Sequence, residues 1–155
     1  MWSSGNSVAA ILMLMMEDRG HLKYDEAVAS YWPEFAKHQK GKIKVEDVLR
    51  HESGLSNFKQ RINVKFTSTE NIKKNKIGEV IEDEHVEFPF GCYRYYHGVT
   101  RDLITNEIFR RVEPKKRTMS EFLNEELKPL FGDEDLDIHI SVADEDLDRC
   151  FDFRY

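Results

Sequence analysis

A run of nine apolar residues, Val8–Met16, stands close to the start of the chain. Because the run has no polar face, it predicts a helix over residues 7–19 that is buried on all sides. Gly20 is expected to end this helix, since glycine readily adopts the left-handed conformation of the residue that follows many helices. The run is much shorter than the roughly 20 residues needed to cross a bilayer, so no membrane anchor is predicted.

The residues around this run also argue against a secretory signal peptide. No Lys or Arg precedes it, and Glu17, Asp18 and Arg19 follow where a cleavage site would need small residues. We therefore expect neither a signal peptide nor a transmembrane helix. An intracellular location is the default expectation, and the pattern does not separate cytoplasm from mitochondrion.

Further along, apolar spacing predicts several shorter elements. Helices are expected at Val45–His51, at 103–112 and from Met119 to just before Pro129, and alternation predicts a strand over 138–142. Between them, residues 57–87 hold six basic and six acidic residues with few aromatics, and form a weakly structured charged segment. A helix from about Glu70 to Glu82 fits its few apolar positions, although Gly78 disfavours it.

Length and charge set the remaining limits. The 155 residues suit a single domain. Nine acidic residues against two arginines make residues 132–155 an acidic C-terminal segment, and no basic stripe stands elsewhere, so nucleic-acid binding is not expected.

Cys92 and Cys150 are far apart and lack a metal-ligand spacing, so neither a metal site nor another cofactor is predicted.

Two polar residues that lie one helical turn apart, Ser3 and Asn6, precede the apolar helix. Ser3 is placed where a helix N-terminus favours negative charge on a serine oxygen, and it can act either as nucleophile or as helix cap. On the residues alone the cap is the favoured interpretation. Asn6 shares a face with Ser3, and its amide can orient the serine but cannot accept its proton.

Taken together, several segments resemble the β-lactamase and penicillin-binding-protein-like serine hydrolases, especially the class C β-lactamases and the β-lactamase-domain proteins of animals. The segments are, in chain order, Trp2–Ala9, Met13–Leu22, Tyr24–Val28, Tyr31–Phe35, Ile43–Leu55, Pro89–Gly91, Tyr96–Thr100 and Ile104–Val112. Each match is weak alone, but their order along almost the whole chain is specific.

The resemblance assigns roles to a few positions. In this family a Ser-x-x-Lys motif supplies the serine nucleophile and a lysine that helps to deprotonate it. Ser3 matches the serine, whereas Asn6 stands at the lysine position. Tyr96 matches the family's catalytic tyrosine, and His97 is a further candidate base because its pKa suits the task better. His51 and Ser53 match a structural turn of the family. A phenol of ordinary pKa near 10 acts as a base only beside a cation, which Asn6 is not.

The resemblance also implies a fold class. It predicts an α+β, partial β-lactamase/transpeptidase-like fold: mostly the helical portion, with the main antiparallel sheet and its Lys-Thr-Gly-type motif largely missing. With so little architecture around Ser3, even a lysine restored at position 6 is expected to give little activity.

Three functional hypotheses follow. The first is a catalytically inactive remnant or truncated product of a β-lactamase-related serine hydrolase, with Ser3 and Tyr96 vestigial. The second is a non-enzymatic interaction module that uses the Tyr31–Phe35 aromatics or the acidic segment to bind a protein partner. The third is a fragment of a longer, active serine esterase or peptidase.

Overall fold

The computed structural model describes residues 2–132 and 138–140, and the chain forms two compact units, residues 1–119 and 120–155. The elements of the first unit are η1 (Trp2–Ser4), α1 (Gly5–Asp18), η2 (Val28–Ser30), η3 (Pro33–Lys42), α2 (Val45–Leu49), η4 (Val64–Thr67), α3 (Thr69–Lys73), α4 (Lys76–Asp83) and α5 (Thr100–Val112). Three further elements follow: α6 (Met119–Phe122), the π-helical turn η5 (Leu123–Leu127) and α7 (Lys128–Phe131).

The described residues are helical, as expected for the helical portion of the predicted fold. Their β-structure is a single antiparallel bridge between Ala27 and Lys44. The predicted strand over 138–142 is wrong where the structure describes it, because residues 138–140 form no strand; residues 141 and 142 lie outside the described part. Most of the acidic segment 132–155 also lies outside it.

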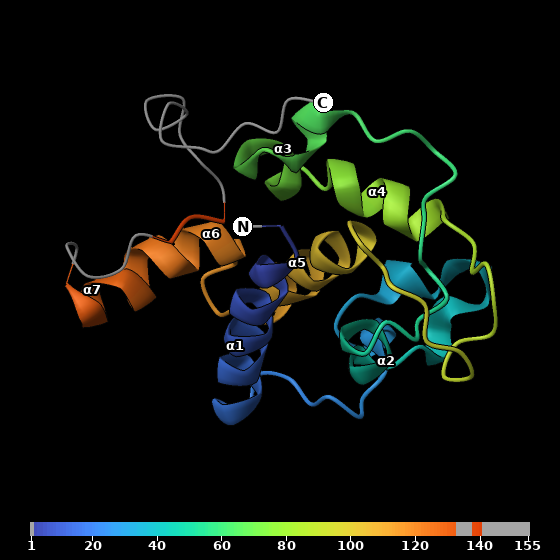
Figure 1. Ribbon diagram of the computed structural model, residues 1–155, viewed down its shortest axis with the longest axis horizontal. Coiled ribbons are helices and arrows are strands. Elements are labelled where there is room, and N and C mark those ends of the chain that lie inside the picture. Colours follow the sequence, from blue (N-terminus) through green and yellow to red (C-terminus); the bar gives the residue numbers. More distant parts are fainter. Residues whose placement is uncertain (1, 133–137, 141–155) are drawn as a thin grey trace. The chain divides into compact units, whose positions relative to one another are not determined.

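Helix α5 is the centre of the first unit. It packs against α1, α2 and α4, and Figure 1 shows it lying between α1 and α4. Ile104, Ile108 and Phe109 on α5 are fully buried in this core. The two ends of α5 therefore reach different neighbours, and the N-terminal end leads to the candidate site.

Helix α1 forms where the apolar run predicts it, but its burial is one-sided. Leu12, Met13 and Met16 are inaccessible to solvent, whereas Ile11 is 53% exposed and Leu14 is 55% exposed. The prediction of burial on all sides is thus wrong within this structure, because α5 covers one face. Gly20 follows the helix at φ +73°, as predicted.

In the described part of the chain, every helix is too short or too polar to cross a membrane.

The aromatic cluster Tyr31–Phe35 belongs to the interior. Trp32 and Phe35 are fully buried, with ring centroids 5.3 Å apart. These two rings are therefore not available as a surface for a protein partner, which corrects that part of the interaction-module hypothesis.

Within the charged segment 57–87, the helix predicted from about Glu70 to Glu82 is divided into two helices, α3 and α4. The left-handed conformation of Asn75, φ +62°, separates α3 from α4. Asparagine is among the few non-glycine residues that adopt this conformation at modest cost. The apolar positions Ile72, Val80 and Ile81 are buried as their spacing suggested.

The helical stretch from Met119 continues past its predicted end. The turn η5 changes the hydrogen-bond pattern, and α7 then begins at Lys128 with Pro129 in its first turn. Proline is tolerated there because the first N–H groups of a helix have no intrahelical partner. Pro129, which was expected to end the helical stretch, thus lies in the first turn of a new helix.

Buried charged side chains connect the start of η3, α4 and the C-terminal half of α5. Two carboxylates, two arginines and the uncharged side chains that hydrogen-bond them form what we call the buried charge network: Glu82, Glu107, Arg110, Arg111, Trp32 and Asn75. The Glu107 carboxylate, fully buried, accepts hydrogen bonds from Arg110 at 2.6 Å and from Arg111. The Arg111 guanidinium also lies 3.9 Å from the Trp32 ring centroid. The opposite charges balance inside this network.

A buried lysine caps one helix of the same region. The Lys40 ammonium donates hydrogen bonds to the backbone oxygens of Glu82, at 2.9 Å, and Glu84 at the C-terminal end of α4. A cation there satisfies carbonyls that the helix leaves unpaired and matches the helix dipole. Burial lowers the pKa of Lys40 to about 8.

A tight turn positions the loop that leads to Tyr96. Gly54 adopts φ +75°, and a Cβ there would overlap the Phe88 carbonyl oxygen. The Gly54 carbonyl accepts the Glu87 N–H at 2.8 Å, and the His51 carbonyl accepts the Tyr95 N–H at 3.1 Å. Glycine at position 54 therefore lets the loop over 87–97 lie against the turn and fixes its end beside α1.

Candidate active site

Ser3 and Tyr96, 93 positions apart in the sequence, meet at the N-terminal end of α1. The Ser3 hydroxyl oxygen lies 2.7 Å from the Tyr96 hydroxyl oxygen, and either can be the donor. Ser3 is exposed, and Tyr96 is 52% exposed. Ser4, not Ser3, is the residue before the α-helix, and its side chain makes no capping bond. Ser3 therefore contacts the tyrosine that the resemblance paired with it.

Asn6 bridges the tyrosine and an arginine. Arg101, whose side chain is 5% exposed, donates from its guanidinium to the Asn6 side-chain oxygen at 3.2 Å. Because a guanidinium only donates, the oxygen of the amide must face Arg101. The Asn6 amide nitrogen consequently faces Tyr96 and donates to its hydroxyl oxygen over a long 3.4 Å.

Arg101 itself is held on three sides. Its Nε donates to the Leu49 carbonyl at 3.2 Å, and its guanidinium also contacts the Asp102 carboxylate at 2.9 Å. This arginine was not singled out from the sequence. Its position in the sequence could have drawn attention to it. A basic residue in the first turn of a helix is unfavourable next to the positive end of the helix dipole, so another interaction is expected to hold it there.

His51 supports the tyrosine from its other side. The two rings lie with centroids 5.0 Å apart. The His51 backbone has φ +63°, and its Nδ1 accepts the His97 N–H at 3.1 Å. Burial, and then the nearby charges of Arg101, His97 and Arg94, lowers the pKa of His51 and favours its neutral form.

His97 points into the interior instead of towards Ser3. It is fully buried, and its Nδ1 lies 2.5 Å from the Tyr95 carbonyl, so this nitrogen carries the proton. Its Nε2 accepts the hydroxyl of the buried Ser53 at 3.0 Å. Burial lowers the pKa of His97. The Ser53–His97 pair thus joins the turn to the loop, in agreement with a structural role for Ser53.

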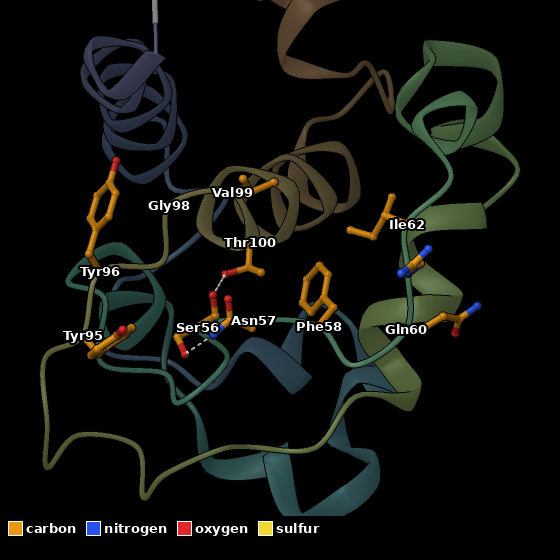
Figure 2. A pocket seen from close by; sticks show the side chains of 11 residues that line it. Ser56, Asn57, Phe58, Gln60, Ile62, Tyr95, Tyr96, Gly98, Val99 and Thr100 are labelled. Atoms are coloured by element: carbon orange, nitrogen blue, oxygen red, sulfur yellow. Dashed lines mark hydrogen bonds between the residues drawn. The ribbon is translucent and has the colours of Figure 1, made fainter. Parts of the chain in front are cut away.

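The backbone beside Tyr96 leaves the ring little room. A Cβ at Gly98 would lie 3.2 Å from Cε1 of the Tyr96 ring, closer than most such contacts. Figure 2 shows the Tyr96 side chain extending past Gly98 towards α1. Glycine at position 98 therefore permits the ring orientation that reaches Ser3.

An open cavity of about 480 Å³ adjoins the tyrosine. Its walls are formed by Ser56, Asn57, Phe58, Gln60, Arg61, Ile62, Tyr95, Tyr96, Gly98, Val99 and Thr100 (Figure 2). Ser3 is not among these residues. The cavity therefore lies next to the Ser3–Tyr96 pair but is built by the 56–62 loop and the start of α5.

Metal chemistry has no ligand set in the described part of the chain. No group of three or more His, Cys, Asp or Glu side chains there is arranged to hold a metal ion. The chemistry that the site offers is that of a serine hydroxyl, a phenol, an amide and a guanidinium.

Comparison with known proteins connects this geometry to one family. A family model described as Beta-lactamase matches residues 1–149. The esterase/beta-lactamase LipL of Mycobacterium tuberculosis is 36% identical over 58 residues, which make up 37% of this chain and 14% of that protein.

Solved structures share the arrangement of the helices. A penicillin-binding protein homologue from Caulobacter crescentus is 35% identical and superposes with a TM-score of 0.81 over 96% of this chain. A family VIII carboxylesterase is 25% identical, with a TM-score of 0.71 over 81% of the chain. The chain spans 38% and 33% of the lengths of these two proteins.

Proposed function

The chain belongs to the β-lactamase family of serine hydrolases, and we propose that it is a catalytically inactive member in which Ser3 and Tyr96 keep their contact without a group to activate the serine. The observation that carries the proposal is the Asn6 bridge between Arg101 and Tyr96. The family likeness makes acyl transfer to Ser3 the reaction to test.

The direction of the hydrogen bonds supports inactivity. Attack by Ser3 on a carbonyl requires a base that accepts the serine proton. The Tyr96 oxygen accepts the Asn6 amide N–H, and it shares a 2.7 Å hydrogen bond with the Ser3 hydroxyl in which either oxygen can be the donor. The residue at the lysine position therefore donates to the tyrosine and, as an amide, has no basic atom that could accept a proton from either hydroxyl.

The other basic side chains do not replace the missing lysine. His97 uses both ring nitrogens in buried hydrogen bonds, to Tyr95 and Ser53. The Nδ1 of His51 is bonded to the His97 backbone. Arg101 is a permanent cation, so it cannot accept a proton. Asn6 stands between its guanidinium and the Tyr96 hydroxyl and is hydrogen-bonded to both.

An activated ester tests the proposal. Incubation with p-nitrophenyl acetate would transfer an acetyl group to a reactive Ser3 and release p-nitrophenolate. We expect the intact mass and the release rate to match those of Ser3→Ala, because loss of one member of a nucleophile–base unit typically costs several orders of magnitude in rate. Circular dichroism spectra of both samples check that a lack of acetylation is not caused by unfolding.

Acetylation mapped to Ser3 in the wild-type chain, and absent from Ser3→Ala, would overturn the proposal. That result would favour the alternative of an active esterase or peptidase, of which this chain represents a part. The substrate of such an enzyme would then be sought among esters, β-lactams and peptides.

A further inference from the structure

We infer that the cavity between the 56–62 loop and the start of α5 reversibly binds a small organic carboxylate that carries an aromatic or branched apolar group. The inference goes beyond the proposed function, because binding here requires neither Ser3 as nucleophile nor any covalent step. It rests on the shape, the lining and the charge of the cavity.

The walls of the cavity suit an apolar group. Phe58 and Ile62 are half-buried on one side, and Tyr95 and Val99 are 62% and 67% exposed on another. Figure 2 shows the Phe58 ring directed towards the space beside Val99 and Thr100. Such partly exposed aromatic and aliphatic surface gains free energy when a ligand removes it from water. The volume of about 480 Å³ is within the usual range for small-molecule sites.

The charge of the lining favours an anion. Arg61 is the one charged residue that lines the cavity, and it forms no ion pair or hydrogen bond with any residue that the structure describes. Two acidic side chains that contact the loop are engaged there: Glu87 with Ser56 and Asn57, and Glu84 with the Lys59 backbone N–H at 2.7 Å. An exposed cation that has no carboxylate partner within residues 2–132 and 138–140 can bind one from a ligand.

The start of α5 adds to this preference. Gly98, Val99 and Thr100 line the cavity, and no side chain caps the helix at Val99. The N-terminal end of a 13-residue helix has partial positive charge. The Thr100 hydroxyl is occupied by the Leu55 carbonyl at 2.6 Å, so it fixes the loop instead of facing the ligand.

Three matched probes separate these contributions. Phenylacetate has both the ring and the carboxylate, phenylacetamide keeps the ring without charge, and acetate keeps the charge without the ring. Titration of the ¹⁵N-labelled full chain, read by amide chemical shifts, is expected to give a Kd in roughly the millimolar range for phenylacetate. Shifts should centre on residues 56–62 and 95–100, with weaker binding of the other two probes.

Two variants of the same loop test the role of charge. Arg61→Gln should weaken phenylacetate binding about fivefold and leave phenylacetamide binding unchanged, as expected for an exposed ion pair. Lys59→Gln removes an equal charge from the same loop at a residue that does not line the cavity, and should leave the Kd of phenylacetate unchanged.

Any of three results would overturn the inference. These are no saturable phenylacetate shifts at 20 mM (roughly the upper end of the millimolar range), shifts centred outside the cavity residues, or an equal loss of affinity in Lys59→Gln and Arg61→Gln. The readout is reversible and does not depend on Ser3 acylation, so its failure is distinguishable from failure of the proposed function.

Discussion

Helix α5 carries arginines near both of its ends, and two of them, Arg101 and Arg111, have opposite surroundings. Near the C-terminal end, Arg111 contacts the carboxylate of the buried Glu107 and the face of Trp32. At the N-terminal end, Arg101 contacts a neutral amide, a backbone carbonyl and the Asp102 side chain, which is 44% exposed. Both guanidiniums are shielded, but only the first meets a buried carboxylate.

This difference separates a region whose charges are paired in the interior from one whose polar groups are partly exposed. A buried cation with a buried carboxylate makes a closed unit, whose disruption leaves an uncompensated charge. Arg101 instead contacts the partly exposed Asp102 carboxylate and the amide of Asn6 beside Tyr96, and the cavity next to Tyr96 has a further cation in Arg61. The N-terminal end of α5 is therefore the region suited to an anionic ligand.

The largest effect is expected from breaking the buried charge network. Glu107→Gln keeps the shape of the side chain but removes the charge that Arg110 and Arg111 share. We expect a loss of about 3 kcal/mol in the free energy of unfolding, measured by urea denaturation, because two guanidiniums lose a buried carboxylate.

Glu70→Gln is the matched control, since it removes a carboxylate from the solvent-exposed pair with Lys74. Its effect on the free energy of unfolding is expected to be within the error of the measurement, because solvent-exposed ion pairs contribute little. Equal costs for both variants would show that the buried network has no special part in stability.

The next effect concerns Lys40 and is a dependence on pH. The pKa of Lys40 is lowered to about 8 in the folded chain by burial, from an ordinary value of 10.5. Between these values the unfolded chain binds more protons, so stability should rise as the pH increases from 8 to 10.5, by about 2 kcal/mol. Below pH 8 both states are protonated and the contribution is constant.

Lys40→Met removes this titration, and the difference in stability between the wild type and the variant should therefore change with pH over that window. Urea denaturation at several pH values measures it, and the other titrating groups cancel in the difference. A constant difference from pH 7 to 10.5 would contradict the lowered pKa.

At the other end of α5, the charge at position 6 tests the surroundings of Arg101. Asn6→Lys would place an ammonium against the guanidinium, now 3.2 Å from the Asn6 oxygen, and should destabilise the chain by about 2 kcal/mol. The cost should largely disappear when Arg101→Gln is combined with it, since the repulsion then has no second charge. An unchanged cost in the double variant would point to steric crowding.

The smallest effect comes from the opposite charge. Asn6→Asp would give Arg101 a carboxylate partner like that of Arg111, and should stabilise the chain by up to about 1 kcal/mol in thermal or urea denaturation at low salt. The gain should decrease as salt is added. A loss of stability would show that the Asn6 amide contact with Tyr96 matters more than the charge.

Local patterns in the sequence were sufficient for much of the fold. The apolar run predicts α1, glycine at position 20 marks its end, and the spacing of Ile104 and Ile108 predicts α5, because these features depend on neighbours within a few residues. The order of motifs identified the family and paired Ser3 with Tyr96 before any distance was known. The exposure of Ile11 and Leu14 did not follow, since it depends on where other elements pack.

By itself, then, the sequence determined the family, most of the helices and the presence of an amide at the lysine position. Only the tertiary structure decided what that amide does: Arg101, 95 positions away, turns the Asn6 oxygen towards itself and the nitrogen towards Tyr96. It likewise placed His97 against Ser53 and away from Ser3. The reason is physical, because helix propensity acts over neighbouring residues, whereas the direction of a hydrogen bond depends on partners that the fold brings together.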